Sequence, residues 1–403
     1  MRIIIFDDHK RENFFPITFT RSTGDLRVGI LKLRQRIAAY FSSEGTNIIV
    51  SSDLEDLYKE RLPIKKINEV PTGENLFVNS RIKIDEKFVK DCKNLQPGYC
   101  FVQEGVVLAA KVSNEKSEHI TSETLDFSNL TEIPKEYGTW NYLWDLVHEN
   151  SKMIQQDFDD FFYEKDNFFE TETGVHILNP YNVWIGEGAS MSPGVVVDAG
   201  AGAVVIDEGA KIMANAVIIG PAYIGKNSTI KVGAKIYEGT SIGPVCKVGG
   251  EVEETIIQAY SNKQHDGFLG HSYLGEWVNL GADTNNSDLK NNYKNVKLYC
   301  YPNKAKIDSG SQFVGTFIGD HSKTGINSTI NTGTVIGCAC NLFGGDLISD
   351  HLKSFSWGTG KRIIDYYPKQ FIETAELVKK RRKKDLTETE IKLYKKIYEE
   401  ERK

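Results

Sequence analysis

Histidines, closely spaced arginines and paired aspartates are the side chains of this sequence best suited to group-transfer chemistry. His265 lies in a polar stretch, and imidazole accepts a proton near neutral pH, so His265 is a candidate general base. Arg11, Arg21 and Arg27 lie close together near the N-terminus. Guanidinium groups offer several donors in a planar fork, which suits them to phosphate groups. The sequence therefore predicts a proton acceptor in one region and an anion-binding region in another.

The aspartates Asp7 and Asp8 directly follow an apolar run, Arg2–Phe6, which is a candidate first strand. Carboxylate oxygens are ligands that Mg²⁺ prefers, so these two residues are candidate metal ligands. A glycine-rich phosphate-binding loop is not evident after this run, because no glycine precedes Gly24. Two interpretations therefore stay open: the N-terminal region catalyses a reaction at phosphate groups, or it only binds them.

A branched aliphatic residue recurs at every sixth position between residues 206 and 248. The fifth place of each hexad is small, and the fourth place is often Gly or Asn, which tolerate a positive φ. Period six fits neither an α-helix nor an ordinary strand. It predicts a parallel β-helix over residues 175–345, with three hexads in each triangular turn and the aliphatic residues inside. These residues are Ile206, Ile212, Ile218, Ile224, Ile230, Ile236, Ile242 and Val248.

The hexad pattern breaks twice, within Gly249–Gln264 and within Asn285–Lys306. We expect both breaks to be polar loops that leave the solenoid, and the pattern to resume at Phe268. Loops of this kind on a rigid scaffold often carry functional sites. His265 would then lie at the end of the first loop and project onto the wall of the solenoid.

The sequence on either side of the repeats predicts two further parts: an α/β domain over residues 1–165 and a helical tail over residues 346–403. In the tail, Thr387 and Glu390 have the spacing of a capping box. The basic run 379–384 lies among acidic residues, which favours a solvated helix surface over a nucleic-acid site. The expected strands of the α/β domain are 2–6, 46–51 and 74–79, its helices are 25–40 and 53–61, and a helical connector follows over 140–162.

The composition excludes several classes of protein. A net charge of −6 and a pI near 5.9 argue against a nucleic-acid-binding protein, and 40% hydrophobic residues argue against a disordered chain. No run approaches the roughly 20 apolar residues that cross a bilayer, and the N-terminus does not resemble a signal peptide. The six cysteines lack the spacing of a disulfide framework. We therefore expect a cytoplasmic protein that binds neither nucleic acid nor a membrane.

Residues 263–284 carry a resemblance to a known family, with the sequence KQHDGFLGHSYLGEWVNLGADT. This segment is similar to the acetyltransferase half of the bifunctional glucosamine-1-phosphate acetyltransferase/uridylyltransferases, and the whole chain resembles a shorter bacterial branch of that family. The resemblance implies left-handed coils, a homotrimer with sites between subunits, and acetyl-CoA as co-substrate. It also implies an amino-sugar 1-phosphate as acetyl acceptor, and nucleotidyl transfer to a sugar 1-phosphate with Mg²⁺ in the N-terminal domain.

The same resemblance implies roles for single residues. His265 falls on the catalytic histidine of the family, and Asn279 falls on an Asn that contacts the sugar. The backbone N–H groups of Gly281 and Ala282 would stabilise the oxyanion that develops during acyl transfer. The remaining assignments are Lys263 and Phe268 for the substrate, Gly281, Gly325 and Ile326 for acetyl-CoA, and Arg11, Arg21 and Arg27 for the nucleotide.

Three positions depart from the family pattern. Asp283 stands where the longer enzymes of the family have glycine. Phe268 stands where the family has a tyrosine, and Asn79 stands where it has a Mg²⁺-binding aspartate, which leaves Asp7 or Asp8 as metal ligands. The first alternative is therefore a nucleotidyltransferase whose β-helix serves only trimerisation. The second alternative is a non-catalytic, regulatory protein that binds sugar nucleotides.

Two further groups of residues suggest metal sites. His271 and His321, on a β-helix, raise the alternative of the zinc site of γ-class carbonic anhydrases, but the histidine spacing of that site is missing. We favour hydrogen-bonded corner residues for both. Cys338 and Cys340 have the spacing of a metal-binding pair, yet Cys340 occupies the small fifth place of its hexad, which favours packing.

Overall fold

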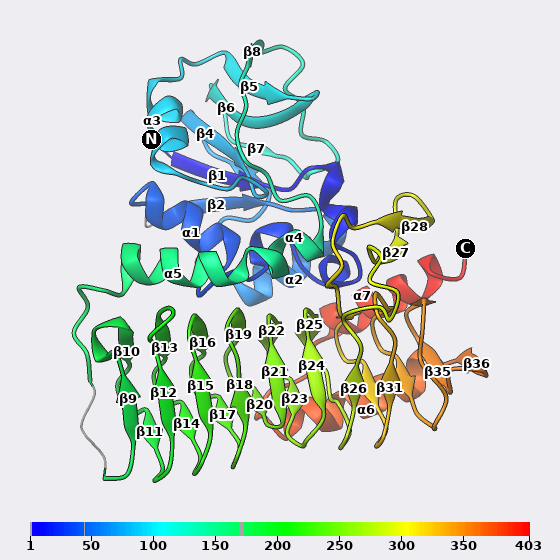
Figure 1. The fold of residues 1–403 in the computed structure, drawn as a ribbon. Coiled ribbons are helices and arrows are strands. Elements are labelled where there is room, and N and C mark those ends of the chain that lie inside the picture. The colour runs from blue at the N-terminus through cyan, green and yellow to red at the C-terminus, as the bar shows by residue number, and fades with distance from the viewer. Residues whose placement is uncertain (1, 44, 169–172) are drawn as a thin grey trace.

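The N-terminal domain lies on one face of a long solenoid, and two helices pack at the C-terminal end of that solenoid (Figure 1). The computed structural model describes residues 2–43, 45–168 and 173–403. The predicted connector and tail helices are confirmed, including the capping box at Thr387. The helices are α1 (Leu33–Tyr40), α2 (Glu55–Arg61), α3 (Glu86–Asn94), α4 (Leu143–His148), α5 (Asn150–Phe161), α6 (Pro368–Lys380) and α7 (Glu388–Glu400).

A six-stranded sheet forms the centre of the N-terminal domain, in the order β2-β1-β4-β6-β5-β8. β1 pairs in parallel with β2 and β4, and its residues Ile3, Ile4 and Ile5 are buried, as a central parallel strand requires. β6 pairs antiparallel with β4 and β5, so the sheet is mixed. The strands of this domain are β1 (Arg2–Phe6), β2 (Thr46–Ile49), β3 (Glu69–Val70), β4 (Gly73–Asn79), β5 (Tyr99–Gln103), β6 (Val106–Asn114), β7 (Glu118–His119) and β8 (Thr131–Pro134).

Helix α1 is shorter than the helix predicted over residues 25–40, since it begins only at Leu33. The segment before it runs against the solenoid, where the N–H of Arg27 donates to the Tyr273 hydroxyl at 2.8 Å. Gly29 has a φ of +67°, and a Cβ there would lie 2.7 Å from the carbonyl oxygen of Met153 in α5. Contacts with distant parts of the chain therefore hold this segment in an irregular path.

Three parallel sheets form the walls of the solenoid. Ile206, Ile224 and Ile242 pair in register along one wall, so the same interior place is filled in successive coils. The fourth places at Gly209 and Asn215 have φ of +65° and +60°, as their residue types predict. The predicted left-handed parallel β-helix is confirmed.

The walls consist of short strands. The first wall contains β10 (Val183–Ile185), β13 (Val204–Ile206), β16 (Ala222–Ile224), β19 (Thr240–Ile242), β22 (Ile256–Ala259), β25 (Tyr273–Glu276), β29 (Phe317–Ile318), β32 (Val335–Ile336) and β34 (His351–Leu352). The second contains β11 (Ser190–Met191), β14 (Lys211–Ile212), β17 (Thr229–Ile230), β20 (Lys247–Val248) and β23 (Asn262–Lys263), and later β30 (Lys323–Thr324), β33 (Asn341–Leu342) and β35 (Ser356–Gly358). The strand β36 (Ile363–Asp365) follows and pairs antiparallel with β35. The third contains β9 (His176–Leu178), β12 (Val196–Asp198), β15 (Val217–Ile219), β18 (Lys235–Ile236), β21 (Glu251–Glu253) and β24 (Phe268–Gly270), and later the pair β26 (Asn285–Asn286) and β31 (Thr329–Ile330).

The first break in the hexad pattern is not a loop. Residues 249–264 form β21, β22 and β23, which continue the three walls. Val252 and Ile257 fill the interior there, and Leu269, not Phe268, takes the interior place in the next coil. The prediction of an excursion before His265 is therefore wrong, because shortened corners shift the phase of the sequence while the coil stays closed.

The second break is a loop that leaves the coil, as predicted. It contains the antiparallel hairpin of β27 (Lys297–Cys300) and β28 (Ala305–Asp308), which lies against the N-terminal domain (Figure 1). The ring of Tyr301, in the turn of this hairpin, lies 5.5 Å from the ring of Phe15 and 5.3 Å from that of Phe19. Parallel strands also continue past residue 345 as far as β35, so the solenoid extends into the region predicted as the tail.

Buried polar contacts join the N-terminal domain to the solenoid. Helix α5 lies along the first wall, and Asn150 Nδ2 donates to the carbonyl oxygen of Gly239 at 2.7 Å. At the other end of the chain, Lys379 of α6 forms an ion pair with Glu390 of α7. The described helices include none with both the length and the apolar character that a membrane crossing needs.

Candidate functional sites

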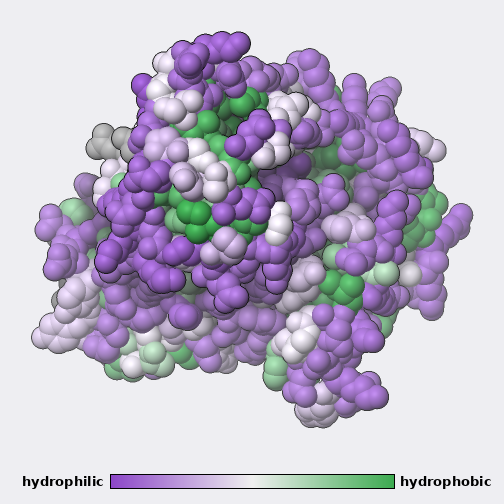
Figure 2. All heavy atoms as spheres, turned by 90° about the horizontal axis from the view of Figure 1, so that it is seen from above, coloured by the Kyte–Doolittle hydropathy of each residue, from purple (hydrophilic) through white to green (hydrophobic). Residues whose placement is uncertain are grey.

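A crevice of about 510 Å³ opens at the carboxyl edge of the N-terminal sheet. Open α/β sheets bind ligands outside the carboxyl ends of their parallel strands, and this crevice lies there, after β1 and β2. Pro302, from the turn of the β27–β28 hairpin, lines one side. Hydrophilic side chains cover most of the face seen in Figure 2, which looks down on the N-terminal domain. The lining residues are Asp8, His9, Lys10, Arg11, Glu12, Asn13, Ser51, Ser122, Glu123 and Pro302.

Arg11 is the predicted nucleotide-binding residue that lines this crevice. Its Nη1 donates to Ser51 Oγ at 2.9 Å, and its Nε and Nη2 donate to the carbonyl oxygen of Thr18 at 3.2 and 2.8 Å. These bonds hold the guanidinium group beside Lys10 and His9. The crevice therefore offers the cationic groups of Arg11 and Lys10 to an anionic ligand, beside the carboxylates of Glu12 and Glu123.

Arg21 and Arg27 lie outside the crevice, in the interface between the N-terminal domain and the solenoid. Arg21 is only 1% exposed, and its Nη2 lies 2.5 Å from Asp320 Oδ2. Burial opposes the charge of Arg21, but the carboxylates of Asp320 and Glu276 outweigh it and raise the pKa of Arg21. The guanidinium carbon of Arg27 lies 5.1 Å from the ring centroid of Tyr223. The structure thus corrects both nucleotide-binding assignments, because these side chains connect the two domains.

The carboxylates of Asp7 and Asp8 are already occupied by protein donors. Asp7 accepts hydrogen bonds from Ser22 Oγ and Ser80 Oγ at 2.9 and 2.7 Å, and burial raises its pKa. Asp8 is held by Arg81, whose Nε and Nη2 donate at 2.9 and 2.5 Å. Burial opposes ionisation of Asp8, but the bonds from Arg81 prevail and lower its pKa. The pair therefore does not fit Mg²⁺, because an ion would have to displace a bidentate guanidinium group.

Three consecutive turns of the solenoid stack at one edge and bring several predicted residues together. The N–H of Asp283 donates to the carbonyl oxygen of Asp266 at 3.0 Å, and the N–H of Asn327 donates to that of Ala282 at 2.8 Å. His265 is exposed in the first of these turns, and Ile326, in the third, is 69% exposed. The exposed edge therefore combines an imidazole, backbone polar groups and an apolar side chain.

Phe268 and Asn279 flank this edge. The N–H of Phe268 donates to Asn285 Oδ1 at 2.8 Å, and its side chain is half-buried at the start of β24. Asn279 lies on the second wall, where its Oδ1 accepts a hydrogen bond from Asn262 Nδ2 at 3.4 Å. Both residues are thus available beside the turn that carries His265.

Lys263 points into the solenoid and not toward a surface substrate. It pairs with Val248 at an interior place and is 2% exposed. Its Nζ donates to the carbonyl oxygens of Gly249 and His265 at 3.0 Å each, and burial lowers its pKa to about 8. The assignment of Lys263 to substrate binding is therefore corrected: its ammonium group positions the turn that carries His265.

Gly281 makes close stacking of the coils possible. Its N–H donates to Thr324 Oγ1 at 3.0 Å, so this group is not free to bind an oxyanion. A Cβ at Gly281 would lie 2.3 Å from the carbonyl oxygen of Gly325 in the next coil. Of the two expected oxyanion donors, the N–H of Gly281 is therefore already used. The N–H of Ala282 stays a predicted donor.

The tail contributes a residue that the sequence analysis did not assign to the site. Arg382 belongs to the basic run, and its Nη2 donates to Asn262 Oδ1 at 2.8 Å, next to Asn279. The charge pattern of the run indicated only a solvated helix surface, and most of the run is exposed. No local sequence pattern indicates this contact, because it depends on how the tail folds back on the second wall.

In the part of the chain that the structure describes, His321 and His271 each contact neighbouring protein groups. His321 is 1% exposed, its ring centroid lies 5.8 Å from that of Trp277, and burial lowers its pKa well below the ordinary value. His271 lies at a corner with a φ of +45° and bonds to Asp288. All six cysteines are free, and Cys340 packs in the solenoid core as predicted.

Comparison with known proteins agrees with this division of the chain. Residues 3–165 match the family model of sugar nucleotidyl transferases, and residues 203–238 match that of the bacterial transferase hexapeptide, which describes six repeats. These matches confirm the two parts that the sequence resemblance implied: a sugar nucleotidyltransferase domain followed by hexapeptide repeats.

Curated relatives match over part of their length. A bifunctional sugar-1-phosphate nucleotidylyltransferase/acetyltransferase of Sulfurisphaera tokodaii is 36% identical over 154 residues, which are 37% of this chain and 37% of that protein. A bifunctional protein GlmU of Synechococcus sp. (strain CC9311) is 26% identical over 179 residues, 44% of this chain and 34% of that protein. The chain thus spans about a third of the length of these relatives. Among solved structures, a Francisella novicida UDP-N-acetylglucosamine acyltransferase is similar, with a TM-score of 0.31 and 15% identity over 58% of this chain and 85% of that one.

Proposed function

We propose that the chain is a two-domain transferase of sugar-nucleotide biosynthesis, whose solenoid transfers an acetyl group from acetyl-CoA to an amino-sugar 1-phosphate. The observation that carries this proposal is the stack of three turns that places His265, Ala282 and Ile326 along one exposed edge. The similarity to a bifunctional nucleotidylyltransferase/acetyltransferase supports the same reaction. The named sugar and acyl group rest on the resemblance of residues 263–284.

In the proposed reaction, the acceptor amine attacks the thioester carbonyl, and His265 takes a proton from the amine nitrogen. The tetrahedral intermediate then collapses to the amide, and the CoA sulfur leaves with the proton that His265 returns. The N–H of Ala282 is the proposed donor to the oxyanion. Asn279 would orient the sugar, and Arg382 would bind the phosphate of the acceptor. Gly325 and Ile326 would lie against acetyl-CoA.

The N-terminal domain would bind a nucleoside triphosphate in the crevice and transfer its nucleotidyl group to a sugar 1-phosphate. In this step an oxygen of the sugar phosphate attacks the α-phosphorus, and pyrophosphate leaves. Arg11 and Lys10 would neutralise the phosphate charge. Mg²⁺ would reach the crevice as part of the triphosphate substrate, because Asp7 and Asp8 do not fit it.

A second candidate function for the N-terminal domain is nucleotide binding without catalysis. The bidentate bond between Arg81 and Asp8 favours this alternative, because it neutralises Asp8, the carboxylate of the crevice that directly follows β1. The two candidates predict different products. Pyrophosphate release with UTP or dTTP and a sugar 1-phosphate supports catalysis, whereas nucleotide binding without release supports a regulatory domain.

A homotrimer in the cytoplasm completes the proposal. The exposed edge with His265 and Ile326 is open to solvent in the single chain, which suits a site that a neighbouring subunit closes. The six free cysteines suit a reducing compartment.

The test of acetyl transfer measures thiol release from acetyl-CoA with glucosamine 1-phosphate. We expect His265→Ala to lower kcat by about 10²- to 10⁴-fold, as loss of a general base does. His176→Ala is the matched control, because His176 is exposed on β9 and belongs to the first coil of the solenoid. Unchanged turnover in His265→Ala would contradict its role, and wild-type protein without acceptor-dependent release would contradict acetyl transfer itself.

A further inference from the structure

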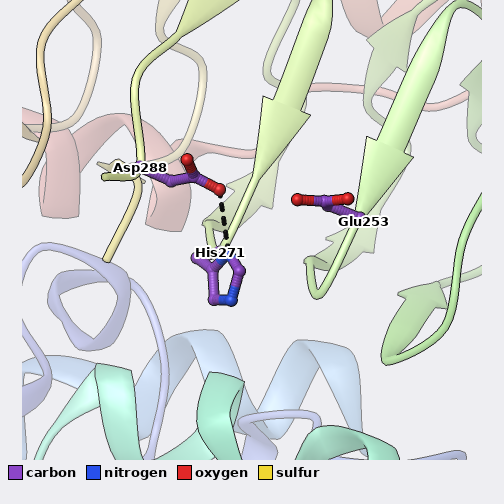
Figure 3. Close-up of side chains that lie close together, drawn as sticks. All are labelled: Glu253, His271 and Asp288. Carbon is purple, nitrogen blue, oxygen red and sulfur yellow. Dashed lines mark hydrogen bonds and ion pairs between the residues drawn. The ribbon is translucent and has the colours of Figure 1, made fainter. Parts of the chain in front are cut away.

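Three potential metal ligands converge near the base of the long loop, away from the edge that carries His265. Glu253 ends β21, His271 follows β24 at a corner of the next coil, and Asp288 follows β26 where the loop leaves the solenoid. One ligand atom from each side chain lies within 4.8 Å of the other two. Figure 3 shows the carboxylate of Glu253 facing the hydrogen-bonded pair of His271 and Asp288.

The backbone fixes this arrangement. Glu253 pairs with Gly270 across β21 and β24, and the N–H of His271 donates to the carbonyl oxygen of Glu253 at 3.3 Å. A Cβ at Gly270 would lie 2.4 Å from Asp288 Oδ2, so the glycine leaves the space that this carboxylate fills. The ring of His271 stacks on that of Phe313 with a centroid distance of 5.2 Å. The three side chains are therefore brought together by the coil and by both ends of the loop.

The charge and exposure of the cluster suit a cation. Two carboxylates face one imidazole, and Nδ1 of His271 lies 2.8 Å from Asp288 Oδ2. The side chains of His271 and Asp288 are 16% and 13% exposed, so an ion can reach them while much of the surrounding water is excluded. Partial exclusion of water strengthens the attraction between a cation and two carboxylates.

We propose that Glu253, His271 and Asp288 bind one divalent transition-metal ion of the Zn²⁺ type, through His271 Nδ1 and one oxygen of each carboxylate. An imidazole nitrogen with carboxylate oxygens is a donor set that Zn²⁺ accepts, whereas Mg²⁺ and Ca²⁺ favour oxygen ligands alone. The ion takes the place of the proton between Nδ1 and Asp288 Oδ2. Binding to the imidazolium form therefore releases one proton to solvent.

Such an ion would attach the loop to the solenoid. Asp288 lies on the loop whose Pro302 lines the nucleotide crevice, whereas Glu253 and His271 belong to the coils. Three protein ligands also leave a coordination position for water or another donor. The metal would thus hold the hairpin in place against the N-terminal domain.

Isothermal titration of the full-length, untagged protein with ZnCl₂ tests this inference, with MgCl₂ in a parallel titration. We expect one Zn²⁺ per chain with an affinity at least 100-fold above that for Mg²⁺. His271→Ala and Asp288→Asn should each weaken the Zn²⁺ affinity at least tenfold. His176→Ala, which removes an exposed histidine elsewhere on the solenoid, should leave the affinity unchanged.

A second measurement separates loss of the site from loss of the fold. Co²⁺ in place of Zn²⁺ should give a visible absorption band that His271→Ala abolishes, while thermal unfolding in EDTA stays the same for both proteins. Stoichiometric Zn²⁺ binding that survives in both His271→Ala and Asp288→Asn would overturn the proposal. The absence of Zn²⁺ binding by the folded wild-type protein would overturn it as well.

Discussion

The guanidinium group of Arg21 lies 2.5 Å from the carboxylate of Asp320, although 299 positions separate the two residues in the chain. Thr20 Oγ1 donates to the same carboxylate at 2.7 Å, and the N–H of Glu276 donates to its other oxygen at 2.8 Å. This buried pair therefore joins the start of the N-terminal domain to the later coils of the solenoid.

Replacing Arg21 should destabilise the protein strongly. Arg21→Met leaves the buried Asp320 without its cationic partner, and a broken buried pair costs about 3–5 kcal/mol in the free energy of unfolding. Chemical denaturation measures this change. Asp346→Asn, which removes the surface pair with Lys361, is the control and should change the free energy of unfolding far less, because surface ion pairs contribute little. If Arg21 instead contacted the nucleotide, Arg21→Met would weaken nucleotide binding while leaving stability near that of the control.

Arg11, in contrast, should affect nucleotide affinity. Arg11→Ala removes a guanidinium group from the crevice, and loss of a charged hydrogen bond of about 1.5–3 kcal/mol weakens binding by roughly 10- to 100-fold. Isothermal titration with UTP or dTTP measures the dissociation constant. Arg2→Ala is the control, because Arg2 is an exposed arginine of the same domain that donates to the Thr72 carbonyl at 3.0 Å. Equal affinities for both variants would exclude the crevice as the nucleotide site.

Lys263 should make stability depend on pH. Burial lowers the pKa of Lys263 to about 8 in the folded protein, whereas a solvated lysine has a pKa of 10.5. Between these two pH values the unfolded chain therefore binds more protons than the folded protein does. The free energy of unfolding should therefore rise with pH in this window, by up to about 3 kcal/mol. Lys263→Met should lose that part of the rise, because it has no proton to release.

Urea denaturation across this pH range measures the effect of Lys263. Lys323, whose pKa burial also lowers to about 8, contributes a second rise that Lys263→Met retains. Lys294→Met, at an exposed position of the long loop, serves as control and should follow the wild-type curve. If the free energy of unfolding changed with pH in the same way for wild type and Lys263→Met, burial would not lower the pKa of Lys263.

Arg382 should affect the use of the phosphorylated acceptor. We expect Arg382→Ala to raise KM for glucosamine 1-phosphate about tenfold or more with little change in kcat, because a phosphate contact acts on binding. Lys384→Ala, an exposed change in the same basic run, should leave both constants unchanged. Steady-state kinetics of thiol release decide between the two outcomes. An unchanged KM in Arg382→Ala would place the acceptor phosphate elsewhere.

The periodic part of the fold was predictable because each hexad carries its own geometric requirement. The aliphatic residue, the small residue and the Gly or Asn at Gly209 or Asn215 act within one coil, so a local pattern is sufficient. The coils around Val252 and Leu269 escaped this pattern, because shortened corners change the phase without opening the coil. The assumption of a constant six-residue period therefore led to the prediction of a loop where the coil is continuous.

The candidate sites were predictable only where a sequence motif or the repeat of the coils places the residues. His265, Ala282 and Ile326 follow from the resemblance and the stacking of coils, and Arg11 follows from its position after β1. The places of Arg21 and Lys263 depend on tertiary contacts: one reaches Asp320, and the other turns inward at a place that pairs with Val248. No local pattern distinguishes an arginine at a domain interface from one at a phosphate site.

The hairpin of β27 and β28 limits how freely the two halves can be recombined. Its Pro302 lines the crevice of the N-terminal domain, although the chain that carries it leaves and rejoins the solenoid. An isolated N-terminal fragment would lack the side of the crevice that Pro302 forms, and a chimaera with a solenoid from another protein would lack it too. A chimaera that keeps the complete crevice would have to include residues 287–314 together with residues 2–165, although the two segments are not continuous in the chain.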